Sequence, residues 1–411
     1  MCRKTKDSDL TRREFVTTVG LAGMAVIGGS GTGALAATEQ PVPGAKKASI
    51  VHKRKLGKTG AEVSILGFGG INDTPNNQLL LKQARKWGVT YWDTAESYGH
   101  GLSEEGIGLF FSRNPGARQE IFLVTKLQPK GGNFTERLDK SLKRLKTDYV
   151  DLFFVHSLTG IGDLPANSKE WAAEMKKAGK IKFFGFSTHT NMADCLLGAA
   201  KLDYIDAIML TYNFQVMGSH KMKEAVAACV KSGIGLVSMK TQAGRPGKHE
   251  VGGPAKLAMI DTFLKRGFTD KQAKLKVVWE NPNIASICSQ MPNLTILSAN
   301  VAAARDLTKL SREEFESLQQ YAQETQKEYC AGCGQICQAA LGGAVPVNEV
   351  MRSLMYHRYY GEPELARETF AGLPGDVRER LTQVDYTPAE QACPHKLAIA
   401  SLMRQAAEVL T

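Results

Sequence analysis

The stretch Tyr91-Trp92-Asp93-Thr94-Ala95-Glu96-Ser97-Tyr98-Gly99 sets the pattern that the rest of the chain follows. Val89 to Trp92 is a β-branched and aromatic run, typical of a buried strand, and it stops at the carboxylate of Asp93. A segment with Tyr98 follows, so we expect a strand end that leads into a loop. An Asp at a strand end and a Tyr five residues later can face one pocket. A single Tyr in such a place more often only packs, with its hydroxyl hydrogen-bonded.

Strand-like runs that end near a polar residue recur along the chain. A hairpin-like pair, Lys55-Leu56 and Val63-Ser64, precedes a first strand at Ile65–Phe68. Later runs end near Asp93, Lys126, His156, Ser187, Tyr212, Met239 and Cys288. Helical patterns lie between them at 76–87, 104–111, 135–145, 168–178, 192–200, 221–231 and 271–279.

Eight strands that alternate with helices over roughly 250 residues predict the α/β class and a (β/α)8 TIM barrel. No Gly-x-Gly-x-x-Gly motif directly follows the first strand, which argues against a Rossmann domain. The chain of 411 residues is long enough for a barrel with an appendage.

The spacing of the polar strand ends supports this arrangement. Asp93 and Lys126 are 33 positions apart, and His156 follows after another 30. Ser187 follows His156 after 31 positions. Each interval is about one strand and helix, and in a barrel the carboxyl ends of the strands converge on the face that carries the chemistry. We therefore expect these side chains to meet at one end of the barrel.

Three segments resemble the signature of the aldo-keto reductase family: Asp93 to Gly99, Val124-Thr125-Lys126 and Phe154-Val155-His156. The resemblance extends from about Lys53 to Asn300. It implies a (β/α)8 barrel that transfers a hydride between NADPH and a carbonyl or alcohol. It also implies a catalytic tetrad of Asp93, Tyr98, Lys126 and His156.

These residue types suit carbonyl reduction. Negative charge develops on the carbonyl oxygen, which needs a proton donor within hydrogen-bond reach, and Tyr98 is the candidate. A free phenol titrates near pH 10, so we expect the ammonium of Lys126 to favour the phenolate and Asp93 to hold that ammonium in place. His156 can donate a hydrogen bond that positions the substrate oxygen.

The same resemblance implies that Ser187, Lys240 and Asn300 bind NADP(H). The chain departs from the family pattern elsewhere in this region: Met209 stands where a Gln is usual, and the loop after the last strand keeps only Asn300 of its usual group. These departures motivate an alternative function. In it, the protein is an iron-sulfur electron-transfer or binding module on a barrel that no longer uses NADPH.

The N-terminal segment resembles a twin-arginine export signal. Thr11-Arg12-Arg13-Glu14-Phe15-Val16 precedes a short apolar stretch at 17–28 and a small-x-small cleavage site at Ala34-Leu35-Ala36. A transmembrane anchor is the competing interpretation, but the stretch is short and rich in glycine, so we favour cleavage after Ala36. We predict a signal peptide at 1–36, a linker at 37–52 and a periplasmic or otherwise exported protein that uses the twin-arginine export machinery.

Four cysteines near the C-terminus predict a metal site. Cys330, Cys333 and Cys337 form a C-x2-C-x3-C run, and Cys393 precedes a Pro. Four thiolates suit a [4Fe-4S] cluster, and the chain is similar here to an iron-sulfur branch of the same family. Disulfides and a four-cysteine zinc site are the alternatives. A cluster would also explain export in the folded state and could serve a redox partner.

The predicted organisation is therefore a barrel at 53–305 followed by a helical extension at 306–411 that binds the cluster. An amphipathic helix at Ser311–Lys327, with Ser311 as its N-cap, begins the extension. The formal charge of +11 comes from basic residues scattered among acidic ones along helices, without a nucleic-acid motif, so we expect no nucleic-acid partner.

Overall fold

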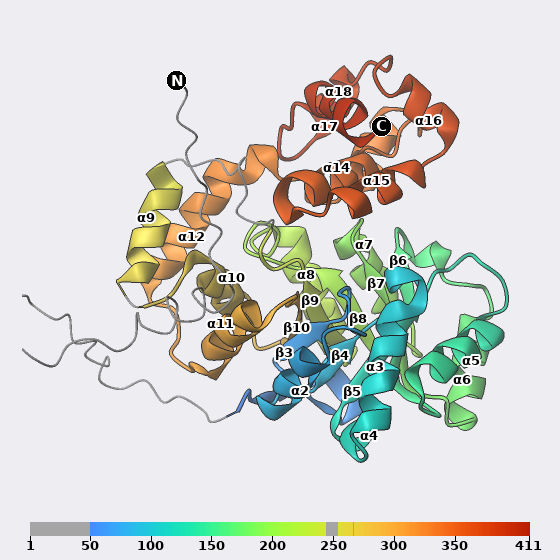
Figure 1. Cartoon of the computed structure of the whole chain (residues 1–411). Helices are drawn as coiled ribbons and strands as arrows, with labels where there is room; N and C mark the ends of the chain where they lie inside the picture. Colours follow the sequence, from blue (N-terminus) through green and yellow to red (C-terminus); the bar gives the residue numbers. More distant parts are fainter. Residues whose placement is uncertain (1–49, 244–253, 266) are drawn as a thin grey trace, which may run out of the picture. The chain divides into compact units, whose positions relative to one another are not determined.

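Eight parallel strands close into a barrel, in the order β10-β3-β4-β5-β6-β7-β8-β9 (Figure 1). The structure is a computed structural model that describes residues 50–243, 254–265 and 267–411. The predicted (β/α)8 barrel is confirmed. Its strands are β3 (Leu66–Gly69), β4 (Tyr91–Asp93), β5 (Phe122–Leu127), β6 (Val150–Leu158), β7 (Ile181–Thr188), β8 (Ala207–Thr211), β9 (Gly235–Met239) and β10 (Ile284–Gln290).

An antiparallel hairpin precedes the barrel, as the sequence predicted. It consists of β1 (Lys53–Lys55) and β2 (Glu62–Ser64), paired from Lys53 with Ser64 to Lys55 with Glu62. The Arg54 guanidinium donates to the carbonyl oxygens of Trp279, Asn281 and Ile284, at distances from 2.7 to 3.1 Å. The hairpin is therefore fastened to the segment that enters the last strand.

Helices between the strands pack their apolar faces on the outside of the barrel. In α5 the buried side chains Leu138, Leu142 and Leu145 follow helical spacing, and Asn133 caps the helix through the amides of Thr135 and Glu136. The helices that connect strands are α2 (Gln78–Lys86), α3 (Leu102–Arg113), α4 (Ala117–Glu120), α5 (Phe134–Leu145), α6 (Ser168–Lys177), α7 (Met192–Ala199), α8 (His220–Lys231), α9 (Pro254–Leu264) and α10 (Asp270–Trp279), and α11 (Leu294–Arg305) follows the last strand. The sequence had not predicted α4, α9 or α11.

Side chains fill the interior of the barrel, so a reaction site can form only at its ends. Tyr91, Phe154 and Met209 are among the buried residues of this inner core. Gly185 allows β7 and β8 to approach closely, because a Cβ atom there would lie 1.8 Å from the carbonyl oxygen of Ala207. Because side chains fill the interior, the space for a reaction lies at the ends of the strands.

The C-terminal extension has a hydrophobic core of its own. That core runs from Val345 to Leu410 and includes Phe370 and Met403, which are 1% and 0% exposed. By contrast, Leu318 and Tyr321 of α12 belong to the core that surrounds the barrel strands. Ser311 caps α12 as predicted, in a reciprocal pair of bonds with Glu314. The helices after the barrel are α12 (Arg312–Thr325), α13 (Gly334–Ala340), α14 (Val347–Met355), α15 (Pro363–Ala371), α16 (Gly375–Arg380), α17 (Thr387–Ala392) and α18 (Ile399–Leu410), with a π-helical turn η6 (Tyr356–Tyr360) after α14.

Barrel and extension belong to one compact unit, 44–411. The predicted signal peptide at 1–36 and the linker up to residue 49 lie outside the described residues. Within the described part of the chain, no helix combines the length and apolar character that a membrane span requires.

Candidate active site

The structure brings the four predicted catalytic residues together at the carboxyl ends of neighbouring strands. Asp93 ends β4, Lys126 lies near the end of β5 and His156 near the end of β6. The Lys126 ammonium forms a short ion pair with Asp93 and donates to the backbone oxygen of Thr94 at 2.9 Å. It also lies 3.3 Å from the hydroxyl oxygen of Tyr98. The predicted contact between the ammonium and the phenol is therefore present.

The loop after β4 orients Tyr98. Tyr98 begins the 3-10 turn η3 (Tyr98–Gly101), in which Gly99 and Gly101 have φ angles of 57° and 97°. Such positive angles are easily adopted by glycine, so the turn folds the loop back without strain at these positions. The ring of Tyr98 meets the ring of His156 edge-on, with 5.7 Å between their centroids.

Burial sets the charge state of this group. Lys126 is 1% exposed, and although burial lowers its pKa, Asp93 and Tyr98 outweigh that effect, so the pKa of Lys126 lies above its ordinary value. Burial also raises the pKa of Tyr98, and the opposing influence of Lys126 is smaller. The phenol is thus held as a protonated donor. The sequence had suggested a shift towards the phenolate, but desolvation of the enclosed hydroxyl dominates.

His156 is a neutral hydrogen-bonding group in this site. Burial, followed by the charges of Lys126, Arg352 and Lys240, holds its pKa well below the ordinary value. The Gln128 side-chain amide lies 3.3 Å from its Nδ1, and the amide nitrogen can only donate, so Nδ1 accepts. The proton of the neutral ring is then on Nε2, which can donate. The sequence analysis had not singled out Gln128.

The predicted cofactor residues lie in two environments. Ser187 lies near the end of β7 and is 1% exposed. Its hydroxyl oxygen accepts a hydrogen bond from the Ser157 amide at 2.9 Å. Lys240 directly follows β9, and its ammonium donates to the Tyr356 hydroxyl at 2.8 Å. Asn300 lies on α11 and donates to Ser289 Oγ on β10 at 3.1 Å. Ser187 and Lys240 therefore lie at the strand ends, and Asn300 on the helix after the last strand.

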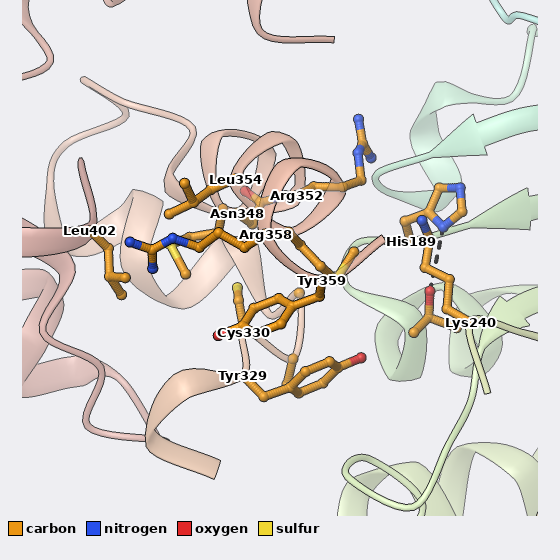
Figure 2. Close-up of a pocket in the computed structure, with 15 residues that line it drawn as sticks. His189, Lys240, Tyr329, Cys330, Asn348, Arg352, Leu354, Arg358, Tyr359 and Leu402 are labelled. Atoms are coloured by element: carbon orange, nitrogen blue, oxygen red, sulfur yellow. Dashed lines mark hydrogen bonds between the residues drawn. The ribbon is translucent and has the colours of Figure 1, made fainter. Parts of the chain in front are cut away.

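A cavity joins the ends of β7, β8 and β9 to the extension. It has an empty volume of about 590 Å³, including its open mouth. On the barrel side it is lined by His189, which donates or accepts at 3.4 Å from Thr211 Oγ1, and by Lys240 (Figure 2). On the other side it is lined by Tyr329, Cys330, Arg352, Arg358 and Tyr359 of the extension. Extension residues thus complete the wall of a cavity at the mouth of the barrel.

Contacts across this boundary fix the extension to the strand ends. Asn213 donates to the Tyr329 hydroxyl at 2.9 Å, and Thr190 donates to Glu349 at 3.0 Å. Residues of the aromatic and basic run at 351–360 line the cavity, and Tyr356 of this run contacts Lys240. The unusual frequency of Tyr and Arg in that run was its only signal in the sequence.

The four predicted metal-ligating cysteines line a second cavity. Cys330 and Cys333 lie on the loop before α13, Cys337 lies on α13, and Cys393 caps the end of α17. The cavity has an empty volume of about 360 Å³ with its mouth, and Ile336, Val347, Leu397 and Ile399 give it an apolar lining. All four thiols are free, as are the other described cysteines.

The thiols in this cavity influence one another. Burial, and then the neighbouring cysteines, raise the pKa of Cys330 to about 12 and that of Cys337 to about 11. Four thiolates could share this space only with a compensating positive charge, which suits a metal-containing group. Among the described residues, no set of three or more His, Cys, Asp or Glu side chains converges to hold a single metal ion.

Comparisons with known proteins agree with the barrel and its site. A family model described as "Aldo/keto reductase family" matches residues 65–322. The chain is 31% identical over 210 residues to the NADP(+) aldo-keto reductase yakc of Schizosaccharomyces pombe, covering 46% of this chain and 60% of that protein. It is 26% identical over 307 residues to the uncharacterized oxidoreductase YqkF of Bacillus subtilis, covering 67% and 97%.

Solved structures give the same result. The holo form of aldo-keto reductase AKR11C1 from Bacillus halodurans superposes with a TM-score of 0.54 at 25% identity, covering 66% of this chain and 96% of that one. A thermostable aldo-keto reductase, Tm1743, superposes with a TM-score of 0.55 at 27% identity and covers 65% and 98%. The four cysteines at 330–393 follow the residues that the family model matches.

We predict that His156→Gln flattens the pH dependence of stability. The folded protein keeps His156 neutral, whereas in the unfolded chain it binds a proton below its ordinary pKa of 6.5. The unfolded state then holds more protons, so the free energy of unfolding falls as pH decreases, by about 1.9 kcal/mol in total from this group between pH 7 and pH 5. Urea unfolding at pH 7, 6 and 5 should show that decrease reduced by this amount in the variant.

The control for this experiment is His220→Gln, because the side chain of His220 is exposed at the start of α8. It should leave the pH dependence of the wild type in place. An equal slope for His156→Gln and the wild type would contradict the neutral state assigned to His156.

Proposed function

Because this chain belongs to the aldo/keto reductase family, and is an oxidoreductase of that type, we propose that it transfers a hydride between NADP(H) and a small carbonyl or alcohol. The observation that carries the proposal is the enclosed group of Tyr98, Lys126 and Asp93 beside His156. Lys126 lies 3.3 Å from the Tyr98 hydroxyl and is ion-paired with Asp93.

In the direction of reduction, Tyr98 donates its proton to the carbonyl oxygen. The Lys126 ammonium stabilises the phenolate that remains, and Asp93 keeps that ammonium charged and oriented. His156 donates from Nε2 to the same oxygen and so fixes the carbonyl between two donors. NADPH, when bound, supplies the hydride that the carbonyl carbon accepts. The product is an alcohol, and the reverse sequence of proton transfers oxidises one.

The residues at the strand ends fit a nucleotide. Ser187 and Asn300 carry neutral hydrogen-bonding groups, and Lys240 carries a positive charge. Ser187 and Lys240 belong to the ends of β7 and β9, on the same side of the barrel as His156. These three residues would hold NADP(H) there.

A second candidate function is an electron-transfer or binding module that does not use NADPH. The contacts of Tyr356 with Lys240 and of Tyr329 with Asn213 favour it, because extension side chains already occupy these strand-end groups. Titration of the purified protein with NADPH separates the two functions. Saturable binding supports the reductase, and absence of binding supports the module.

We predict that Tyr98→Phe lowers kcat by at least about 100-fold, because it removes the proton donor and leaves the ring in place. The assay follows NADPH oxidation with a set of simple aldehydes. Binding of NADPH and the circular dichroism spectrum should not change. Tyr204→Phe is the matched control, since Tyr204 stacks on Phe184, on the helix side of β7. Wild-type kcat in Tyr98→Phe would contradict the proposed role.

We further propose that Cys330, Cys333, Cys337 and Cys393 bind a [4Fe-4S] cluster that exchanges electrons with a redox partner. Their four thiols line one apolar cavity, and four cysteines are the usual ligands of such a cluster.

The prediction is that protein purified without oxygen contains about four irons and four sulfides per chain. Cys333→Ala should lose most of both, because it removes one ligand from the cavity. Cys229→Ala is the control, since its buried thiol lies on α8 outside that cavity. Zinc in place of iron would contradict the cluster.

We also propose that residues 1–36 direct export through the twin-arginine machinery. The paired Arg12 and Arg13 before a short apolar stretch support it. The mature protein should appear in the periplasmic fraction, and the double variant Arg12→Lys, Arg13→Lys should remain in the cytoplasm. Lys46→Arg with Lys47→Arg, in the predicted linker, is the control. Wild-type protein found only in the cytoplasm would refute export.

A further inference from the structure

The cavity between barrel and extension opens beside the candidate catalytic group. The positive charges of Arg352 and Lys240 each lower the pKa of both His156 and His189. Geometry links the two places as well: Ser187 accepts a hydrogen bond from the amide of Ser157, the neighbour of His156, at 2.9 Å, and His189, two residues after Ser187, lines the cavity. The cavity and the site of proton transfer are therefore neighbours.

The lining of this cavity is positively charged. It contains Lys240, Arg352 and Arg358, and no Asp or Glu is among the residues that line it. Arg352 is paired with Glu349, which lies behind it on α14. Five N–H donors belong to a guanidinium, so this pairing leaves donors available for a ligand.

Lys240 lacks a carboxylate partner among the residues that the structure describes. Its ammonium donates to the Tyr356 hydroxyl at 2.8 Å and lies over the rings of Tyr356 and Tyr360, at 4.2 and 5.4 Å from their centroids. Burial lowers the pKa of Lys240, and Tyr356 and the charge of Glu349, which is itself paired with Arg352, offset this only in part. An anionic ligand would restore that balance.

We propose that Lys240 and Arg352 form an anion-binding subsite, and that the carbonyl substrate is an acid whose carboxylate binds there. The second part rests on the proposed reductase function. The carboxylate would bind Lys240 and Arg352, with the carbonyl group directed to Tyr98 and His156.

The other residues that line the cavity indicate what the uncharged part of this ligand is like. Tyr329, Met351, Leu354 and Tyr359 line it (Figure 2). Aromatic and thioether side chains favour an apolar or aromatic ring over a sugar. The substrate class is therefore a carbonyl compound with an apolar body and one carboxylate.

With Lys240 assigned to the substrate, Ser187 and Asn300 of the predicted cofactor residues remain for the nucleotide; the competing assignment of Lys240 is a phosphate of the nucleotide. Arg352 favours the substrate, because it belongs to the extension, beyond the residues 65–322 that the family model matches. A contact shared by the family's cofactor would not need a residue from outside the family's barrel.

The test compares 4-formylbenzoate with its methyl ester, which differs by one charge. Binding of each to the purified full protein is measured by calorimetry at two salt concentrations, and turnover is measured separately with NADPH. The acid should bind at least about tenfold more tightly than the ester, and only its affinity should fall with salt. Equal affinities would overturn the proposal.

Variants locate the subsite. Lys240→Gln and Arg352→Gln should each remove most of the preference for the acid, and Arg352→Lys should keep part of it by retaining the charge. Arg367→Gln removes the same charge from an exposed position on α15 and should keep the full preference. Preference for the acid that survives both Lys240→Gln and Arg352→Gln would place the anion elsewhere and overturn the proposal.

Two further outcomes separate the claims. If saturating NADP+ abolishes binding of the acid by competition, the charges serve the nucleotide and the substrate assignment falls. If the acid binds with the expected preference but is not reduced, the anion subsite is supported. The proposed reductase function, and with it the assignment of this anion to a substrate, is then overturned.

Discussion

A charged ammonium enclosed in the barrel rim is the constraint on which the site depends. Lys126 is 1% exposed, and it can remain charged there only because Asp93 and the backbone oxygen of Thr94 surround it. Both partners come from the end of β4, which pairs in parallel with β5. The register of two strands therefore decides the charge state of one side chain. Tyr98 and His156 take their properties from that charge and from their own burial.

The barrel strands could be predicted because they follow a regular period, and the same period predicted that Asp93, Lys126 and His156 meet. Tyr98 was suggested by its place five residues after Asp93 and by the family resemblance. Asp93, Lys126 and His156 lie at or near the ends of successive strands, so their spacing in the sequence indicates that they are close in space. Helix α9 escaped prediction because apolar residues occupy most of its positions and give no one-sided pattern. The helices of the extension are harder still to predict from sequence. Helices α16 and α17 have only six residues each, which is too short to show a helical period.

The wall of the cavity could not be predicted from local pattern. Lys240 and Tyr356 are 116 residues apart, and so are Asn213 and Tyr329. No motif links such pairs, because their contact depends on how the extension packs against the strand ends. His189 shows the same limit from the barrel side. It lines the cavity together with residues of the extension, whose position relative to β7 follows from no local sequence pattern.

Order of synthesis gives the shared cavity a further meaning. Translation completes the strands β3 to β10 before it reaches Tyr329, Arg352 or Leu402, which close the cavity. A nascent barrel therefore presents an open mouth, with Lys240 not yet covered by Tyr356. In the finished protein a ligand reaches the strand ends through the open mouth of this cavity. The extension is therefore the last part of the cavity wall to be synthesised, after the strand ends that form the other side.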